Sequence, residues 1–281
     1  MRILVTGAKG QLGSAAANEA ARRGHDALGV DMEDFDITDE AKTRAYLAKA
    51  GPDCVIHCAA YTAVDRAESE PERARAVNAL GTENIAAHCA AENIWLLYIS
   101  TDYVFDGGGS SPWEIDGEPN PLNVYGATKL AGERAARECA KHMIVRTSWV
   151  FGPGGQHFVN TMLRLGRENR TVRVVDDQVG SPTYTLDLAR LLLDMAERPR
   201  AGTYHATNQG YTSWAAFAKQ IFALAGIPCE VAEISSGAFR QKAKRPLNSR
   251  LSPKSLTEAG YALPPPWQDA LARYLREQEP E

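Results

Sequence analysis

The sequence predicts an α/β fold in which a doubly wound parallel sheet is followed by a smaller C-terminal α/β domain. Three observations predict it. Short apolar runs alternate with helical patterns through residues 1–150, a glycine-rich turn follows the first run, and the alternation weakens after residue 150. Strands that are apolar on both faces and separated by helices are typical of a parallel sheet covered on both sides. In such a sheet, ligands bind at the C-terminal ends of the strands.

The predicted elements follow this pattern in chain order. Each strand run is short and rich in apolar residues. The expected strands are 3–6, 27–31, 54–59, 96–101 and 143–147, with an additional one at 173–175. The expected helices are 11–23, 39–50, 72–92 and 127–141, then 160–168, 186–196, 213–225 and 267–276. The pattern divides the chain into a domain at 1–150, to which a segment near 172–205 returns, and a second domain at 151–281.

Composition and charge narrow the classes of partner. The 281 residues are 44% apolar and 23% charged, and the formal net charge of −4 includes no basic stripe. This disfavours nucleic acid and anionic membranes as partners. No apolar run has the length of a signal peptide or a membrane span, and the five cysteines are scattered. We therefore expect a reduced, cytoplasmic protein. The six histidines show no short metal-ligand spacing, so the residues themselves predict no metal site.

A glycine-rich turn joins the first predicted strand to the first predicted helix. Gly7 permits a tight turn, Gly10 lets backbone N–H groups approach a pyrophosphate, and Gly13 allows close packing of helix and strand. The N-terminal end of the helix then faces the phosphates. The alternative is an ordinary strand-to-helix turn, but the strand before it and the helix after it favour a dinucleotide-binding domain of the Rossmann type at 1–150.

Asp31 ends the second predicted strand, where a carboxylate can accept both hydroxyls of an adenosine ribose. The same carboxylate repels a 2′-phosphate, and Met32, Glu33 and Asp34 supply no cation to bind one. The sequence therefore predicts NADH or NADPH as the cofactor, with NADH favoured. Lys9 is the nearby charge that would instead favour NADPH, and a strand-end turn is the structural alternative for Asp31.

Tyr125 and Lys129 are four residues apart and lie on one face of a predicted helix. A phenol titrates near pH 10, so it is a weak acid–base catalyst at neutral pH unless a neighbour stabilises its anion. The Lys129 ammonium can do this. An exposed amphipathic pair is the alternative. The motif Ser100-Thr101-Asp102-Tyr103, at the end of the fourth predicted strand, places a hydroxyl at the ligand-binding edge of the sheet, where it could bond a substrate carbonyl. The convergence of these two elements predicts a carbonyl reductase.

Several motifs together resemble the extended short-chain dehydrogenase/reductase family and, within it, the group of dTDP-4-dehydrorhamnose reductases. The resemblance runs nearly end to end. The motifs that carry it are the glycine turn, 58–65, 100–105, 121–129, 146–150 and 245–251. It implies a Rossmann domain at 1–150 and a mainly substrate-binding domain at 151–281. It also implies that hydride passes to the C4 ketone of a dTDP-4-keto-6-deoxy sugar, dTDP-4-dehydro-L-rhamnose, while Tyr125 delivers the proton.

The resemblance further implies a set of site residues. Lys129 would lower the pKa of Tyr125 and hold the nicotinamide ribose, and Thr101 would orient the ketone. The implied cofactor-binding residues are Gly7, Gly10, Gln11, Leu12, Asp31, Asp36, Ile37, Ala59, Ala60, Tyr61, Tyr125 and Lys129. Tyr103 and Trp149 would pack against the sugar, with aromatic filling at a strand end as the alternative.

A late polar segment contains further candidates. Arg245, Asn248 and Arg250 precede the final predicted helix, and guanidinium groups suit the diphosphate of a nucleotide sugar. The alternative is a solvated loop. Asp102 has no assigned role beyond capping the turn that follows it. Some members of the family are described as Mg²⁺-dependent homodimers, but no carboxylates of this chain are assigned to Mg²⁺.

Two other functions compete with reduction. Dehydratases of this fold place an Asp-Glu pair directly after the strand-end threonine, whereas here Asp102 and Tyr103 follow Thr101, which disfavours dehydration. A nucleotide-sugar epimerase stays open. A second class comprises non-catalytic regulatory subunits that bind the dinucleotide, and the presence of Thr101, Tyr125 and Lys129 argues against that class.

Overall fold

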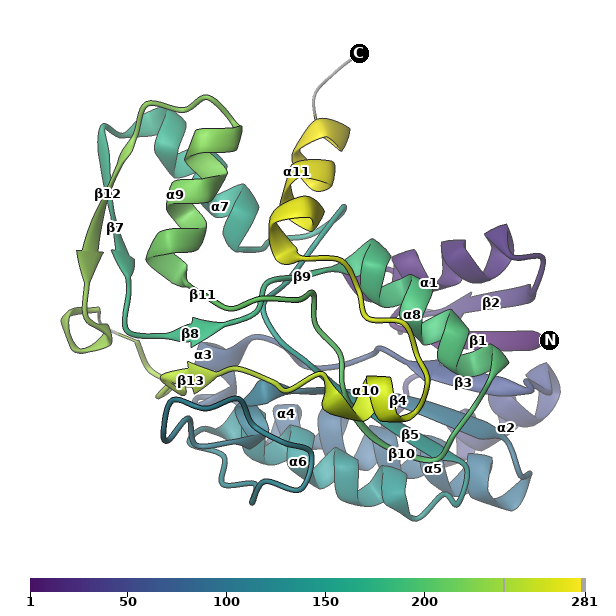
Figure 1. The fold of residues 1–281 in the computed structure, drawn as a ribbon. Helices are drawn as coiled ribbons and strands as arrows, with labels where there is room; N and C mark the ends of the chain where they lie inside the picture. Colours follow the sequence, from purple (N-terminus) through teal and green to yellow (C-terminus); the bar gives the residue numbers. More distant parts are fainter. Residues whose placement is uncertain (240, 279–281) are drawn as a thin grey trace.

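The computed structural model describes residues 1–239 and 241–278. Its central layer is a six-stranded sheet in the order β10-β5-β4-β3-β1-β2, and all neighbouring strands are parallel. The strands are β1 (Arg2–Thr6), β2 (Asp26–Val30), β3 (Cys54–His57), β4 (Trp95–Thr101), β5 (His142–Thr147) and β10 (Gly202–His205). The predicted parallel sheet is confirmed, and Figure 1 shows it between two layers of helices.

Helices cover both faces of this sheet because its strands are apolar on both sides. On one face lie α1 (Gln11–Arg22) and α8 (Thr185–Glu197), and on the other lie α2 (Glu40–Ala50), α5 (Gly81–Ala91) and α6 (Val124–Arg137). Side chains alternate along each strand. In β1, Ile3 and Val5 therefore pack against α1 and α8, whereas Leu4 packs in the core on the α2 and α5 side.

The sheet differs from the sequence-based expectation at its edge. Its sixth strand is β10, which follows α8 and pairs with β5 from Gly202–Met143 to His205–Arg146. The strand expected at 173–175 forms part of β7 (Thr171–Val175), which pairs with β12 (Glu230–Ile234) outside the main sheet. The run of β10 is short and half polar, so its periodicity does not distinguish it from a loop.

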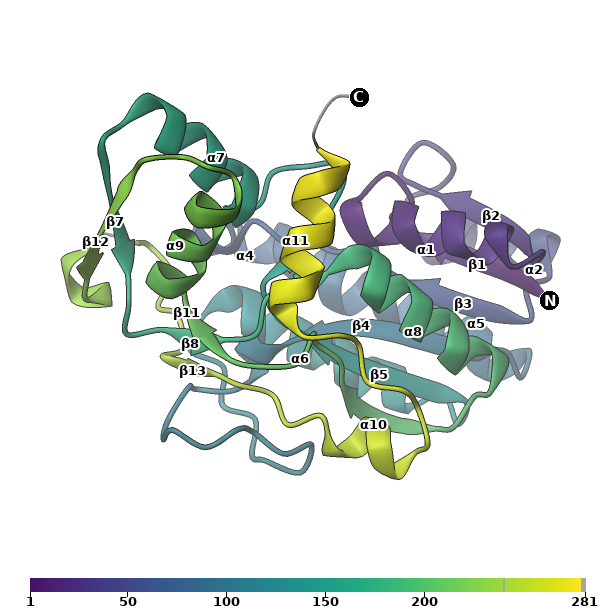
Figure 2. The same ribbon diagram turned by 45° about the horizontal axis from the view of Figure 1, so that its top comes forward.

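A second group of elements lies beyond the C-terminal ends of the sheet strands (Figures 1 and 2). It comprises α7 (Phe158–Glu168), α9 (Trp214–Leu224), α11 (Trp267–Glu277), β7 and β12. These elements enclose a core of their own, which includes Phe151, Phe217 and Phe222. Within the described residues, no helix is long and apolar enough to cross a membrane.

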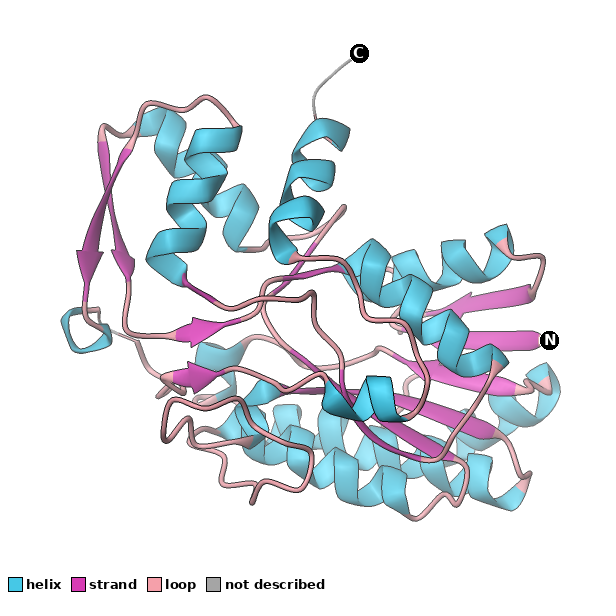
Figure 3. Ribbon diagram, viewed as in Figure 1, coloured by secondary structure: helices cyan, strands magenta, loops and turns pink. Residues whose placement is uncertain are grey.

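Several short elements complete the described structure (Figure 3). They are α3 (Val64–Ala67), α4 (Pro71–Arg75), β6 (Val150–Phe151), β8 (Val179–Gly180), β9 (Thr183–Tyr184), β11 (Thr212–Ser213), β13 (Asn248–Ser249) and α10 (Lys254–Glu258). A π-helix at Ala76–Leu80 joins α4 to α5, and 3₁₀ turns occupy Asp102–Val104 and Ser236–Ala238. The single helix expected at 72–92 therefore corresponds to three consecutive helical segments.

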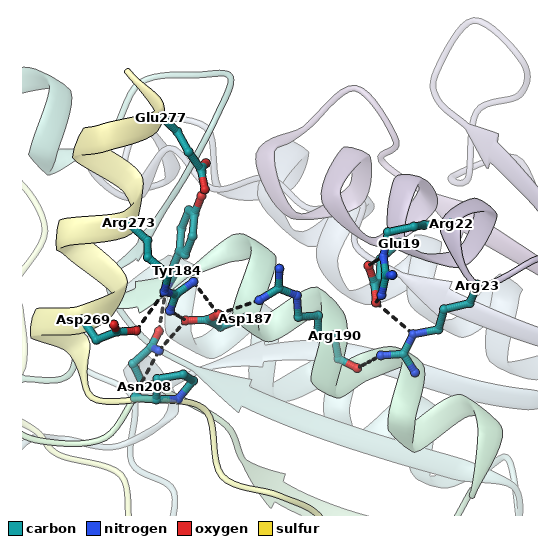
Figure 4. Close-up of polar contacts among 11 residues, drawn as sticks. Glu19, Arg22, Arg23, Tyr184, Asp187, Arg190, Asn208, Asp269, Arg273 and Glu277 are labelled. Atoms are coloured by element: carbon teal, nitrogen blue, oxygen red, sulfur yellow. Dashed lines mark hydrogen bonds and ion pairs between the residues drawn. The ribbon is translucent and has the colours of Figure 1, made fainter. Parts of the chain in front are cut away.

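Ion pairs attach the C-terminal helix to the helical layer of the sheet (Figure 4). Arg273 of α11 binds the buried Asp187 of α8 at 2.6 Å, and the amide of Asn208 donates to the same carboxylate at 2.8 Å. On the other side of α8, Arg23 donates to the carbonyl of Arg190 at 2.9 Å and pairs with Glu19. Because Asp187 is almost fully buried, these partners compensate a charge that would otherwise be costly.

Candidate active site

A cavity of about 1090 Å³ opens where the C-terminal ends of β1, β2, β3, β4 and β5 face the second group of elements. This is where a doubly wound sheet binds its ligands. Of the residues proposed from the sequence, the following line the cavity: Gly7, Gly10, Gln11, Leu12, Asp31, Asp36, Ile37, Ala59, Ala60, Tyr61, Thr101, Tyr103, Tyr125, Lys129, Trp149 and Arg245. The fold thus brings residues from distant parts of the chain to one concave surface.

The glycine turn is closely packed against its neighbours. Gly7 has a φ of +65°, and a Cβ placed there would lie 2.8 Å from the backbone of Ala59. A Cβ on Gly13 would collide with the carbonyl oxygen of Gly7. Gly10 is the N-cap of α1 and has no side chain to bond the first N–H groups of that helix. The turn therefore leaves the N-terminus of α1 open to an anion, as a pyrophosphate requires.

Asp31 lies directly after β2, with both carboxylate oxygens bonded to backbone. Its Oδ2 accepts from the N–H of Lys9 at 3.0 Å, and its Oδ1 accepts from the N–H of Met32 at 2.8 Å. The ammonium of Lys9 pairs with Glu33 at 2.8 Å. The cation that could favour a 2′-phosphate thus has an exposed carboxylate partner.

The catalytic candidates come together because α6 begins very close to the end of β4. Asn123 caps the helix by accepting from the N–H of Gly126 at 2.8 Å. A Cβ on Gly126 would collide with the carbonyl oxygen of Tyr103, so only glycine allows this approach. Tyr125, in the first turn, consequently lies beside the strand end. Its ring contacts that of Tyr103 edge to face, with centroids 5.7 Å apart.

Burial has the largest effect on the pKa of Tyr125. It raises the pKa of the phenol to about 12, a hydrogen bond with Thr101 opposes the rise, and the charge of Asp102 adds to it. The Lys129 ammonium lies over the ring of Tyr98, 4.1 Å from its centroid. Lys129 is not among the groups that shift the pKa of Tyr125 in the free protein. That Lys129 lowers this pKa therefore stays a prediction.

Asp102 is buried next to the hydroxyl of Thr101. Its Oδ1 accepts from Thr101 Oγ1 at 2.9 Å, while its Oδ2 has no hydrogen-bond partner within the described residues. Burial raises the pKa of Asp102 to about 6. Thr101 Oγ1 also accepts from the N–H of Tyr103 at 3.2 Å, so threonine caps the 3₁₀ turn. The side chain that caps this turn is thus that of Thr101, whereas the Asp102 carboxylate accepts from the Thr101 hydroxyl.

A buried ion pair beneath the site was not anticipated from the sequence. Glu133, on α6, accepts from Nε and Nη2 of Arg146 at 2.8 Å each, and both side chains are almost completely buried. Ser100 donates to Glu133 at 2.6 Å, directly before Thr101. Two features of the sequence could have indicated this ion pair. Glu133 follows Lys129 by one helical turn, and Arg146 is a charged residue inside an apolar strand. Together they fix α6 to β4 and β5.

Asn78 is a second residue near the cavity that the sequence analysis did not propose. It lies in the π-helix, a local distortion often found at functional sites. Its Oδ1 accepts from the N–H of Tyr61 at 2.8 Å, and its Nδ2 donates to the carbonyl of Tyr61 and to Thr128. Asn78 thereby holds the loop after β3, which lines the cavity, against the catalytic helix.

Aromatic side chains form the far wall of the cavity. Trp149 stacks on Trp214 with centroids 3.5 Å apart, and Phe158 contacts Trp214 in turn. Trp149 has a φ of +50°, which is rare for a bulky residue and indicates a strained backbone at the site. Trp214 begins α9 and was not proposed from the sequence, because only the tertiary structure brings it next to Trp149.

The late polar segment is only partly at the cavity. Arg245 lines it and forms a two-pronged pair with Asp65, at 2.8 and 3.2 Å. In contrast to our expectation, Asn248 and Arg250 do not line it. Asn248 is buried and donates to the carbonyl of Ser111 at 2.8 Å, while Arg250 donates to Asn248 at 2.9 Å. The Asn248 side chain thus fastens the 108–113 loop, and the Arg250 side chain bonds Asn248.

Comparison with known proteins places this site in a family. The family model described as "RmlD substrate binding domain" matches residues 1–279. The chain belongs to this family. It is 44% identical over 278 residues to a dTDP-4-dehydrorhamnose reductase of Streptomyces griseus, a match that covers 96% of this chain and 91% of that protein. The resemblance seen in the sequence is thus confirmed.

Solved structures agree with the family assignment. A dTDP-4-dehydrorhamnose reductase from Clostridium acetobutylicum has a TM-score of 0.96 and 38% identity, covering 99% of each chain. The enzyme from Bacillus anthracis in complex with NADP has a TM-score of 0.96 and 40% identity, also covering 99% of each chain. The chain therefore has the fold of an extended short-chain dehydrogenase and, like its family, a site for a nicotinamide dinucleotide.

The Mg²⁺ reported for some family members has no evident ligands here. Within residues 1–239 and 241–278, no group of three or more His, Cys, Asp or Glu side chains could hold a metal ion. Where three carboxylates gather on α1 and α8, Arg23 occupies their centre and pairs with Glu19, Asp194 and Glu197 at 2.9, 2.7 and 3.1 Å. A guanidinium group thus neutralises this cluster.

Proposed function

We propose that this protein reduces the C4 ketone of a dTDP-4-keto-6-deoxy sugar, converting dTDP-4-dehydro-L-rhamnose to dTDP-L-rhamnose with NADH or NADPH. The observation that carries the proposal is the placement of Thr101, Tyr125 and Lys129 in one cavity with the glycine turn. The turn fits a dinucleotide because neighbouring backbone leaves no room for a Cβ at Gly7 and Gly13, and because the N-terminus of α1 has no side-chain cap. When bound, the nicotinamide supplies the hydride.

The residues of the chain supply orientation and the proton. Thr101, which donates to Asp102 at 2.9 Å in the free protein, turns its hydroxyl proton to the substrate ketone and so orients it. Tyr125 donates its proton to the ketone oxygen as that oxygen gains negative charge. The buried Lys129 ammonium stabilises the developing phenolate through the low-dielectric surroundings. Trp149 and Tyr103 pack against the sugar, and Arg245 exchanges its bond with Asp65 for the diphosphate.

The reductase differs from a dehydratase or an epimerase in the fate of the cofactor. Those enzymes take their hydride back within each cycle, whereas a reductase consumes one reduced cofactor per sugar. We expect one NADH to be oxidised for each ketosugar consumed, measured by absorbance at 340 nm against product analysis. Tyr103 stands where dehydratases carry a second carboxylate. Incubation with dTDP-glucose and catalytic NAD⁺ should therefore yield no 4-keto-6-deoxy product, and accumulation of that product would show that reduction is the wrong assignment.

We further propose that NADH is bound at least as tightly as NADPH. Asp31 lines the cavity directly after β2, two further carboxylates follow it at Glu33 and Asp34, and Lys9 is paired with Glu33. Replacing Asp31 with alanine should shift the NADH-to-NADPH affinity ratio toward NADPH by at least about tenfold, because the change removes a charge that repels the 2′-phosphate. Fluorescence titration with both cofactors measures this ratio. Asp26→Ala, at the opposite end of β2, is the matched control, and a strong NADPH preference of the unmodified protein contradicts the proposal.

We place the reaction in the cytoplasm, with a nucleotide sugar as the partner and with neither nucleic acid nor membrane involved. All five cysteines are free, and Cys54, Cys89 and Cys139 are buried, as expected where thiols stay reduced. The proposal includes neither Mg²⁺ nor a homodimer.

A further inference from the structure

Tyr98 contacts both ends of Lys129. The tyrosine lies in the middle of β4 and is completely buried. Its ring face lies under the Lys129 ammonium, with Nζ 4.1 Å from the ring centroid, well within the range of a cation–π interaction. Its hydroxyl donates to the backbone carbonyl of the same lysine at 3.2 Å. One side chain therefore touches both the main chain and the charged end of Lys129.

The ring has little freedom to move. A Cβ on Gly132 would collide with the Tyr98 hydroxyl and with the carbonyl oxygen of Asn78, so α6 approaches the tyrosine as closely as glycine allows. The His57 ring lies on β3 with its centroid 5.7 Å away. Burial raises the pKa of Tyr98 well above its usual value, so the phenol stays neutral. The ring thus remains a fixed, uncharged face beneath the ammonium.

Lys129 needs such a partner because few groups nearby compensate its charge. The residue is 2% exposed, and burial lowers its pKa to about 7, although Glu133 and Cys58 oppose the fall. Glu133 is already shared by Arg146, Arg137 and Ser100.

The other titratable groups that face Lys129 carry no compensating charge at neutral pH. Burial raises the pKa of the Cys58 thiol and of Tyr125 to about 12 each, and lowers the pKa of His57 to about 3. The π face of Tyr98 is therefore the electron-rich group directly at the ammonium.

We propose that Tyr98 is a positioning residue that keeps the Lys129 side chain protonated and fixed in the site. Its effect on catalysis rests on the proposed reductase function, whereas the contact itself does not. The ring face, rather than the hydroxyl, carries the effect, because only the ring touches the charged atom. The proposal therefore predicts that removing the ring changes the titration of Lys129, whereas removing only the hydroxyl does not.

The test is a pH titration of Lys129 in the free protein, followed by NMR of ¹³C-labelled lysine and assigned with Lys129→Met. In Tyr98→Leu, the titration midpoint of Lys129 should fall by about one pH unit, because a desolvated cation–π contact is lost. In Tyr98→Phe, which keeps the ring, the midpoint should stay within a few tenths of a unit. Tyr204→Leu, which removes another buried ring from the same sheet, should leave it unchanged.

Several outcomes would overturn the proposal. Equal shifts in the phenylalanine and leucine variants would assign the effect to the hydroxyl or to general loosening, and no shift in either would remove the ring from the role. The unmodified protein gives a check that does not depend on folding of a variant: its Lys129 Hε signals should be shifted upfield by the ring, and unshifted signals contradict the contact.

Activity provides a separate readout. The alkaline limb of kcat should move to lower pH in Tyr98→Leu and not in Tyr98→Phe, since reduction needs the ammonium. If the unmodified protein reduces no ketosugar, the proposed function fails while the NMR titration still decides the role of Tyr98.

Discussion

Replacing Tyr125 with phenylalanine is expected to lower kcat by at least about a hundredfold, because the substitution removes the proposed proton donor and leaves the ring in place. The phenol lies beside Thr101 at the end of β4 and lines the cavity, where it can reach a substrate ketone. Steady-state kinetics with NADH and a dTDP-4-keto-6-deoxy sugar measure the effect. NADH affinity should change little, since the glycine turn and Asp31 supply most of the cofactor contacts in the proposal.

The matched control is Tyr261→Phe, which removes a buried hydroxyl bonded to the carbonyl of Arg198, away from the cavity. It should retain nearly full activity. If Tyr125→Phe turns over at the rate of the unmodified enzyme, the proton must come from another group. Asp102 would then be the first candidate, because it bonds to Thr101 and its pKa is raised to about 6 by burial.

Replacing Glu133 with alanine is expected to lower the free energy of unfolding by about 3–5 kcal/mol, the usual cost of leaving one member of a buried ion pair alone. Glu133 is completely buried, and its loss strands the guanidinium of Arg146, which is 1% exposed. Burial alone would raise the pKa of Glu133, but the bond and charge of Arg146 outweigh it and hold the pKa below its usual value. Urea denaturation followed by circular dichroism measures the loss.

The double variant Glu133→Leu/Arg146→Met separates a stranded charge from lost packing. Because it removes both charges and keeps much of the volume, it should be clearly more stable than Glu133→Ala. Arg164→Ala/Glu168→Ala, which removes an exposed pair on α7, should cost less than about 1 kcal/mol. A loss of less than about 1 kcal/mol in Glu133→Ala would mean that water or a shifted side chain compensates Arg146.

Local patterns in the sequence determined much of the fold and the site. The alternation of apolar runs with helices predicted five strands of the sheet, because strand periodicity and helix periodicity are encoded within a few neighbouring residues. The glycine turn was readable for the same reason. Gly7 is required locally by its positive φ, and Gly13 by its approach to the backbone of Gly7, six residues earlier. The spacing of Tyr125 and Lys129 fixed their common helix face before any contact was known.

The tertiary structure alone decided which distant residues meet. It brought Trp214 against Trp149, paired Arg146 with Glu133, and turned Lys129 over Tyr98. It also directed Asn248 and Arg250 into the protein and made β10 the sixth strand. None of these follows from periodicity, which reports only whether a position faces the interior. A buried charge or ring needs a particular partner, and that partner is chosen by the packing of elements that are far apart in the sequence.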